Sequence, residues 1–243
     1  MITRDRSTGI AGALLAAAML WCGFVTPVAR AQSADVLLDF PIPNGHFFSQ
    51  AAGGSPSAGF TITNLDGIRF WDSFQQVGGV SALGYPSSRR YQSSGFVVQA
   101  TQKALIQWNA ARSQTDTVNA FDELSRLGYD PLLQARRQIP PPFDNTVDAG
   151  KSWEQIVARH TAELDWNKAI KARYMSDPDP ISHFGLPQSY ADEGNVLVVR
   201  CQRAVFQQWK VATPWARAGE VTLANGGDIF KETGLIPAGA VSP

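Results

Sequence analysis

Residues 83–108 read LGYPSSRRYQSSGFVVQATQKALIQW, and residues 184–209 read FGLPQSYADEGNVLVVRCQRAVFQQW. Each stretch begins with a Gly-x-Pro step, continues through a second glycine into an apolar run, and ends on tryptophan after Gln-Lys-Ala or Gln-Arg-Ala. Self-similarity of this kind is typical of duplicated supersecondary units. The sequence therefore predicts two copies of one unit. A repeated surface favours an interaction or scaffold protein over an enzyme, because a catalytic centre is usually built once.

The Gly-x-Pro steps predict a turn in each copy. Proline fixes its own φ and disfavours helix at the residue before it, and a glycine farther along suits the bend into a hairpin. We expect an α+β fold with two repeat units, each a helix, a Gly-Pro turn and an antiparallel β-hairpin, joined by a Pro-rich linker and helices. The matching order of residue types also predicts that Trp108 and Trp209 occupy equivalent positions. The repeat motif consists of Gly84, Pro86, Gly185 and Pro187.

The first 31 residues have the pattern of a secretory signal peptide. Arg4 and Arg6 precede an almost wholly apolar run, residues 10–25, and Ala29-Arg30-Ala31 is a small-x-small cleavage site. The apolar run is shorter than the ~20 residues that a membrane-spanning helix needs. We therefore expect cleavage before Gln32 and a secreted or cell-surface protein. An uncleaved N-terminal anchor is the alternative.

Charge and cysteine content limit the classes of partner. Residues 32–243 hold 18 basic and 20 acidic side chains, a formal charge of −2. Such a chain lacks the electrostatic footprint of nucleic-acid or anionic-membrane binding, so we expect neither nucleic acid nor, after signal cleavage, a membrane as partner. Cys201 is the one cysteine of this segment, which excludes a disulfide within it. Export without disulfides fits a bacterial protein.

Proline divides the mature chain. Pro140-Pro141-Pro142 lies in a segment, residues 134–150, that is typical of an extended linker. This linker separates a first repeat-bearing half, residues 32–133, from a second, residues 151–243. Apolar periodicity and turn residues predict further elements. These are strands at 60–63 and 220–223 and helices at 67–78, 117–127, 151–174 and 228–233.

The turn-plus-hairpin unit resembles the LGFP-type repeats of bacterial cell-surface proteins. The matching residues are Gly79, Leu83-Gly84-Tyr85-Pro86-Ser87-Ser88 and Gly95, then Phe184-Gly185-Leu186-Pro187 and Gly194. The chain is also similar to uncharacterised exported proteins of Chloroflexota-type bacteria. The resemblance covers about residues 46–109 and 183–234. It implies an envelope location and binding to cell-wall polymer, and it supplies no catalytic residues. The second copy departs from the pattern, because Leu186 replaces an aromatic residue and the tandem glycine-rich spacing is missing.

Candidate chemical groups favour structural interpretations. Gly150-Lys151-Ser152 lacks the glycine five positions earlier that a phosphate-binding loop needs. All three histidines precede Cys201, whereas papain-like peptidases place the histidine after the cysteine, so a buried core cysteine is favoured. His160 and Glu163 have a metal-compatible helical spacing, yet His160 lies on an apolar face, which favours a core histidine. We expect no catalytic residues, no metal and no cofactor.

The aromatic residues are the better functional candidates. Six tryptophans remain after residue 31, and exposed tryptophan or tyrosine rings can stack on sugar faces. Tyr85, Trp108 and Trp209 are the candidate ligand-binding residues. Core packing is the competing interpretation for the two tryptophans, because they occupy periodic apolar positions. Tyr85 stands in a turn and can face water.

These observations favour a non-catalytic, exported cell-envelope module that binds a cell-wall or surface glycan. Two alternatives from other classes stay open. One is a hydrolase of wall polymers whose catalytic carboxylates are not recognisable in sequence. The other is a structural or protein-binding surface protein. A cleft with two facing carboxylates would favour the hydrolase, and exposed aromatic rings would favour glycan binding.

Overall fold

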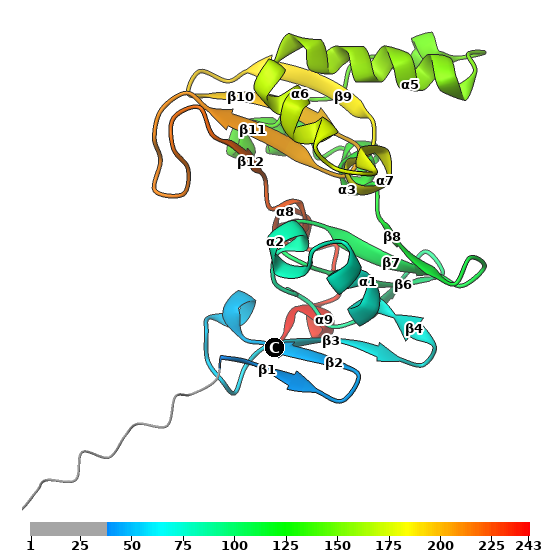
Figure 1. Cartoon of the computed structure of the whole chain (residues 1–243), viewed down its shortest axis with the longest axis vertical. Helices are drawn as coiled ribbons and strands as arrows, with labels where there is room; N and C mark the ends of the chain where they lie inside the picture. The colour runs from blue at the N-terminus through cyan, green and yellow to red at the C-terminus, as the bar shows by residue number, and fades with distance from the viewer. Residues whose placement is uncertain (1–37) are drawn as a thin grey trace, which may run out of the picture. The chain divides into compact units, whose positions relative to one another are not determined.

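Twelve strands in residues 38–243 form three antiparallel sheets of four strands each (Figure 1). These residues are the part of the chain that the computed structural model describes, and the predicted signal segment 1–31 lies outside them. Nine α-helices and three short 3-10 helices accompany the sheets within the described residues. The predicted α+β class is confirmed. Each predicted hairpin belongs to a larger, four-stranded sheet.

The first sheet is a meander in the order β1-β2-β3-β4. Its strands are Asp39–Ile42, Gly45–Phe48, Phe60–Leu65 and Ile68–Arg69. The predicted strand at 60–63 is the start of β3. Two short helices follow, α1 (Phe70–Gln76) and α2 (Gly79–Leu83). The helix predicted at 67–78 is therefore shorter, because Ile68 and Arg69 pair with β3 instead. Phe70 and Phe74 of α1 are buried with Phe48 and Ile62 of the sheet, which fixes the helix on that face.

The other two sheets have the same order of neighbouring strands. The second sheet consists of β5 (Tyr91–Ser93), β6 (Phe96–Ala100), β7 (Leu105–Asn109) and β8 (Gln114–Thr117). The third consists of β9 (Pro187–Asp192), β10 (Val196–Cys201), β11 (Val205–Trp209) and β12 (Val221–Leu223). Each is an antiparallel meander. The strand predicted at 220–223 is β12, which begins one residue later.

The two Gly-Pro turns make the same local contacts. Gly84 and Gly185 both have φ of 74°, a left-handed value that favours glycine. A Cβ at Gly84 would lie 2.7 Å from the Cβ of Gln102, and one at Gly185 would lie 2.6 Å from that of Gln202. In each turn the glutamine Oε1 accepts a hydrogen bond of 3.0 Å from the backbone N–H of the residue after the glycine. Glycine is therefore required at both turns by space as well as by φ.

The strand register shows that Trp108 and Trp209, which the sequence alignment made equivalent, occupy different positions in their strands. Ala100 pairs with Leu105 in the second sheet, and Arg200 pairs with Val205 in the third, so the strands start in the same register. Trp108 is the fourth residue of β7, but Trp209 is the fifth residue of β11, because β11 contains one extra glutamine. Successive strand residues point to opposite faces. The prediction that the two tryptophans are equivalent is wrong.

The helix that follows the second sheet contacts the third sheet, and the helix that follows the third sheet contacts the second. These helices are α3 (Ala120–Arg126) and α8 (Gly226–Glu232), at the places where helices 117–127 and 228–233 were predicted. The N–H of Phe121 donates to the carbonyl of Gln202 at 3.1 Å, and the N–H of Asp228 donates to the carbonyl of Gln102 at 3.0 Å. Each helix therefore begins on the β6–β7 or β10–β11 turn of the sheet that it does not follow.

The helix predicted at 151–174 is divided into three pieces. These are α5 (Trp153–Ala162), the 3-10 helix η3 (Glu163–Trp166) and α6 (Lys168–Met175). Asn167 is the physical reason, because it has extended backbone and its side chain accepts the N–H of Ile170 at 3.0 Å, which caps a new helix. A short helix, α7 (Pro180–Phe184), then leads into the second Gly-Pro turn.

The predicted linker 134–150 begins inside a helix. Helix α4 (Asp130–Arg137) covers its first four residues, and Pro131 suits the first turn of that helix. The proline run itself has no regular secondary structure, and a 3-10 helix, η2 (Thr146–Asp148), follows it. The chain ends with α9 (Ala238–Val241).

Buried side chains from both predicted halves pack in one cluster. Leu105 of β7, Val205 of β11 and Ile139 of the predicted linker all belong to it. Arg200 is also buried between the halves, where it donates to Asp130 at 2.7 Å and to the carbonyl of Phe121 at 2.6 Å. Among the described residues, no helix combines the length and the apolar content needed to span a bilayer.

Candidate functional site

Two tryptophans line one part of a cavity of about 740 Å³ beside the third sheet. Trp209 ends β11, and Trp215 lies in the segment that leads to β12. A volume of this size falls within the range of small-molecule binding pockets, roughly 300–1,000 Å³. Polar side chains complete much of the remaining wall, and they include Arg137, Gln207, Thr222, Asn225, Asp228 and Glu232.

The two tryptophan rings have different exposures. Their centroids lie 5.5 Å apart at an interplanar angle of 82°, an edge-to-face contact. Trp209 is 7% exposed, and its indole Nε1 donates to the hydroxyl of Thr222 at 3.0 Å. Trp215 is 66% exposed. Trp209 therefore supports the wall, while Trp215 offers a free aromatic face to a ligand.

Two carboxylates of α8 line the same cavity. Asp228 and Glu232 are one helical turn apart, a spacing that places them on one face of the helix. Burial raises the pKa of Asp228 to about 6. The amide of Asn225 donates to Asp228 at 3.3 Å, and Glu232 forms an ion pair with Arg137. Near neutral pH, Asp228 is therefore closer to its protonation midpoint than an ordinary aspartate.

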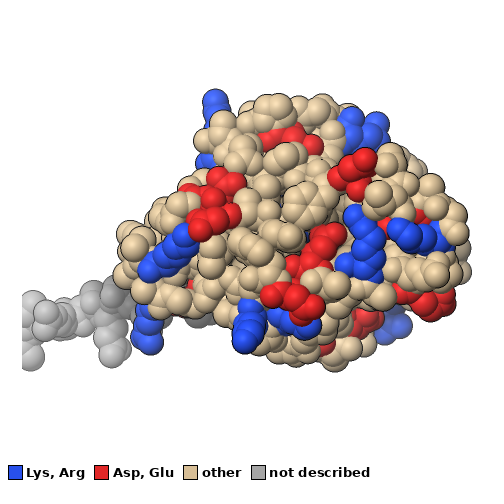
Figure 2. All heavy atoms as spheres, turned by 90° about the horizontal axis from the view of Figure 1, so that it is seen from above, with Lys and Arg blue, Asp and Glu red and all other residues tan. Residues whose placement is uncertain are grey.

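A second cavity, of about 710 Å³, adjoins the first. Lys103, Arg173, Leu223 and Ala224 line both cavities. Burial and, secondarily, the charge of Arg173 lower the pKa of Lys103. Lys103 lies in the β6–β7 turn and donates to the carbonyl of Ser81 at 2.7 Å. The two charged side chains shared by both cavities, Lys103 and Arg173, are therefore both basic. On the face of the molecule shown in Figure 2, acidic and basic side chains are interspersed.

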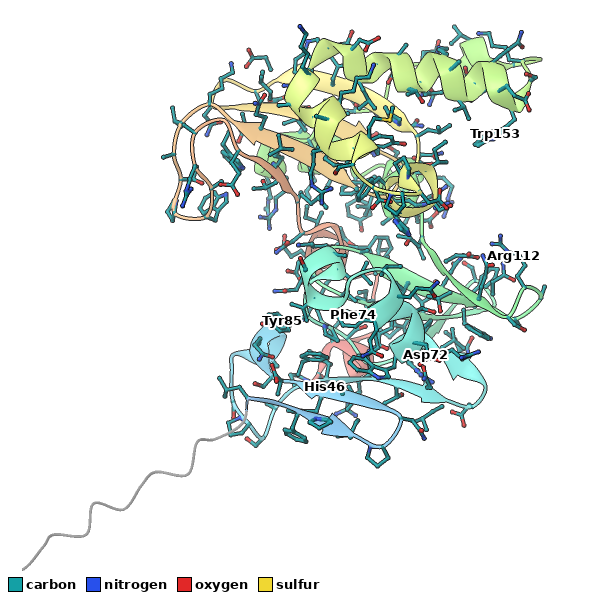
Figure 3. All side chains as sticks on the ribbon, in the orientation of Figure 1. His46, Asp72, Phe74, Tyr85, Arg112 and Trp153 are labelled. Carbon is teal, nitrogen blue, oxygen red and sulfur yellow. The ribbon has the colours of Figure 1, made fainter. Side chains whose placement is uncertain are left out.

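Of the three predicted ligand-binding residues, only Trp209 lies at this cavity. Tyr85 and Trp108 are partly buried against the apolar cluster of the first sheet and α1. The Tyr85 ring lies 5.7 Å from that of Phe48, and Figure 3 shows Tyr85 in the same region as His46 and Phe74. The structure therefore does not bring the three residues into one site.

Cys201 has the surroundings of a structural thiol. It is fully buried among Tyr174, Phe184 and Phe206. Burial raises its pKa well above the usual range, which disfavours the reactive thiolate. Within residues 38–243 it is a free cysteine. These properties support the interpretation of Cys201 as a core residue.

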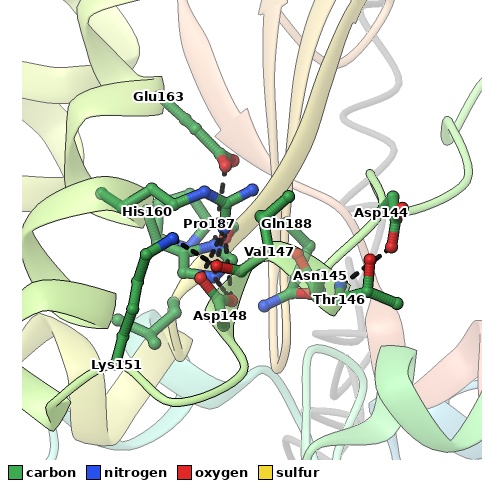
Figure 4. Close-up of polar contacts among 12 residues, drawn as sticks. Asp144, Asn145, Thr146, Val147, Asp148, Lys151, His160, Glu163, Pro187 and Gln188 are labelled. Carbon is green, nitrogen blue, oxygen red and sulfur yellow. Dashed lines mark hydrogen bonds and ion pairs between the residues drawn. The ribbon is translucent and has the colours of Figure 1, made fainter.

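His160 connects the predicted linker to α5 and β9 (Figure 4). It is 2% exposed, its Nδ1 lies 2.6 Å from the carbonyl oxygen of Pro187, and its Nε2 lies 2.8 Å from Asp148. This hydrogen bond is the largest cause that lowers the pKa of Asp148, and Arg159 also donates to Asp148 at 3.0 Å. Both ring nitrogens are engaged, so His160 is a satisfied core residue. Glu163 lies 3.6 Å from the ring.

The described residues contain no group of three or more His, Cys, Asp or Glu side chains placed to hold a metal ion. The aromatic cavity is the better candidate site, because it combines an exposed ring, polar side chains and a carboxyl group of raised pKa. Sequence reasoning missed Trp215 and Asp228. The signal for Trp215 was weak, because a tryptophan in a Pro- and Gly-containing loop has no periodic pattern to identify it.

The sequence matches no protein-family model and no curated protein.

Proposed function

We propose that this protein is a non-catalytic, exported cell-envelope module that binds cell-wall or surface glycan in the cavity of Trp209 and Trp215. The exposed ring of Trp215 beside polar side chains is the observation that carries the proposal. Sugar C–H groups stack on the electron-rich face of an indole ring. The hydroxyl, amide and charged groups of Thr222, Asn225 and Arg137 provide hydrogen-bonding partners for sugar hydroxyls.

A repeated unit is part of the proposal. The matching φ values and hydrogen bonds of the Gly84 and Gly185 turns support two copies of one unit, as does the common strand order of the second and third sheets. The LGFP-type resemblance of these turns supports a location in the envelope or outside the cell. Tyr85 and Trp108 are assigned to packing in this proposal, because both contact the apolar cluster beside the first sheet.

Titration with purified bacterial wall fragments tests glycan binding. We expect saturable binding by the wild type and a loss of at least tenfold in affinity for Trp215→Ala, with an unchanged melting temperature. Trp153→Ala is the matched control, because Trp153 is 57% exposed on α5 and does not line either cavity beside the third sheet. Absence of saturable binding by the wild type would eliminate the proposal and favour the structural or protein-binding alternative.

Hydrolysis of the glycan is a second candidate, favoured by one observation. Asp228, with a pKa near 6, and Glu232, held by Arg137, line the same cavity. Glycosidases use a carboxyl group of raised pKa together with a second carboxyl group. Release of reducing ends from wall fragments by the wild type, and its loss in Asp228→Asn with retained binding, would support this candidate. Binding without product release would support the non-catalytic proposal.

A further inference from the structure

Within residues 38–243, three basic side chains at the aromatic cavity lack an acidic ion-pair partner. The ion pairs among residues 38–243 include neither Lys103, Arg136 nor Arg173. All three line the 740 Å³ cavity, and Lys103 and Arg173 also line the adjoining one. The positive charges of Lys103 and Arg173 repel each other where the two cavities meet. Partial burial of Lys103 removes part of the water that would screen this repulsion.

Nearby carboxylates are already engaged. Asp116 pairs with Arg112 at 2.5 Å, and Asp177 pairs with His183 at 2.7 Å. The other three carboxylates that line the two cavities also have partners. Asp179 accepts the backbone N–H of Ser182, Glu232 forms an ion pair with Arg137, and Asp228 accepts a hydrogen bond from the side-chain amide of Asn225. The charge of Lys103 and Arg173 is therefore not balanced by an ion pair within the described chain.

The donors of these two cations are only partly used. Lys103 donates one hydrogen bond, to the carbonyl of Ser81 at 2.7 Å, and an ammonium group has three N–H donors. Arg173 donates to the hydroxyl of Ser176 at 3.2 Å, and its guanidinium has five donors in a fork that fits a carboxylate or phosphate. Arg203, by contrast, is occupied by Asn119 and by two backbone carbonyls of α7.

We propose that the glycan bound here is anionic, and that a carboxylate or phosphate group of the glycan is bound by Lys103 and Arg173 at the junction of the two cavities. This inference rests on the proposed function and defines its ligand class. The two adjoining volumes, about 740 and 710 Å³, provide room for an oligomer that extends from Trp215 across the junction. The ring of Trp215 contacts a sugar, and the two cations contact the charged substituent.

Chemically neutralised wall fragments test the inference. One preparation is amidated at its carboxylates, a second is dephosphorylated, and a third is untreated. We expect the modification that removes the bound anion to weaken binding about tenfold or more, because the charge-assisted hydrogen bonds to the two cations are lost. The preparation that loses affinity identifies the anion as carboxylate or phosphate.

Variants assign the effect to residues. Arg173→Gln should bind untreated fragments as weakly as the wild type binds the neutralised ones, and it should lose the difference between preparations. Arg173 is exposed, so the substitution is compatible with folding. Arg89→Gln is the matched control, because Arg89 is exposed and lines neither cavity. Lys103→Gln should behave as Arg173→Gln does.

Different results would overturn the proposal of an anionic ligand and the proposal of glycan binding. Equal binding of all three preparations by the wild type, or a preference unchanged in Arg173→Gln and Lys103→Gln, overturns the anionic ligand and leaves glycan binding intact. No binding of any preparation overturns both proposals.

Discussion

The N–H of Asp228 donates to the carbonyl of Gln102 at 3.0 Å, which connects the start of α8 to a turn 126 positions earlier in the chain. The reciprocal bond from Phe121 to Gln202 is 3.1 Å long. Each of the two turns therefore provides the surface on which the helix following the other sheet begins. The fold is held across its halves by backbone groups that side-chain substitution does not remove.

Gly227→Ala should destabilise the protein by about 1–3 kcal/mol, because overpacking at a close approach forces backbone shifts. A Cβ at Gly227 would lie 1.9 Å from the carbonyl oxygen of Thr101. Gly239→Ala is the matched control, since a Cβ there has no neighbour within 4 Å. Urea unfolding of both variants measures the difference. Equal midpoints would show that the α8 contact is not as close as described.

Trp209→Ala should cost about 3–5 kcal/mol of unfolding free energy, because the ring is buried and its removal leaves a cavity. Trp215→Ala should stay within about 0.5 kcal/mol, the usual range for exposed positions. Thermal and chemical denaturation of the two variants test this division. A large loss of stability in Trp215→Ala would place that ring in the core and weaken its role as a ligand platform.

Cys201→Ser should destabilise the fold by about 1–3 kcal/mol, because a buried hydroxyl replaces the thiol. Cys201→Ala, which adds no polar atom, is the comparison. The native thiol should react with a labelling reagent only as fast as the protein unfolds, since it is fully buried and its pKa is raised. Fast labelling of folded protein would contradict the structural interpretation.

Asp228 should make stability depend on pH in the acidic range. Its pKa is raised from 3.8 to about 6 in the folded state, so the folded protein binds more protons than the unfolded chain between these values. The contribution of Asp228 to stability is therefore greatest at and below pH ~4 and is lost as pH rises through about 6. After allowance for solvent screening, the effect is about 1 kcal/mol. Asp228→Asn should remove this slope from melting curves taken at pH 4–7. An unchanged slope would mean that another group causes it.

Sequence patterns predicted the turns and the strands around them because glycine and proline act locally. Gly84 and Gly185 have the left-handed φ that turns demand, and Pro86 and Pro187 follow them in extended segments. The helix boundaries that were predicted wrongly depend on contacts with distant residues or on a single capping side chain. Asn167 divides the predicted long helix by accepting one N–H, and such a cap is easily overlooked within an amphipathic pattern.

The candidate site was harder to predict than the fold. Trp209 was recognised from its strand, but Trp215 and Asp228 come from a loop and from a helix that the sequence did not connect with it. The cavity also includes Arg173 of α6 and Lys103 of the β6–β7 turn. Lys103 lies more than 100 positions before Trp209 in the chain. These side chains line one cavity only because the two predicted halves pack together. Hydrophobic periodicity predicts single helices and strands and does not predict that packing.

The extra glutamine in β11 places Trp108 and Trp209 at opposite parity in their strands, and of the two only Trp209 lines the aromatic cavity. In the second sheet, Trp108 lies on the face of Ile106 and packs toward the first sheet and α1. In the third, the added residue turns Trp209 to the face of Val205 and Gln207, where the cavity lies. Under the proposed function, the chain is therefore expected to be monovalent, with a stoichiometry of one glycan chain per protein. It would anchor to a polymer without cross-linking it, and any avidity would have to come from assembling several molecules.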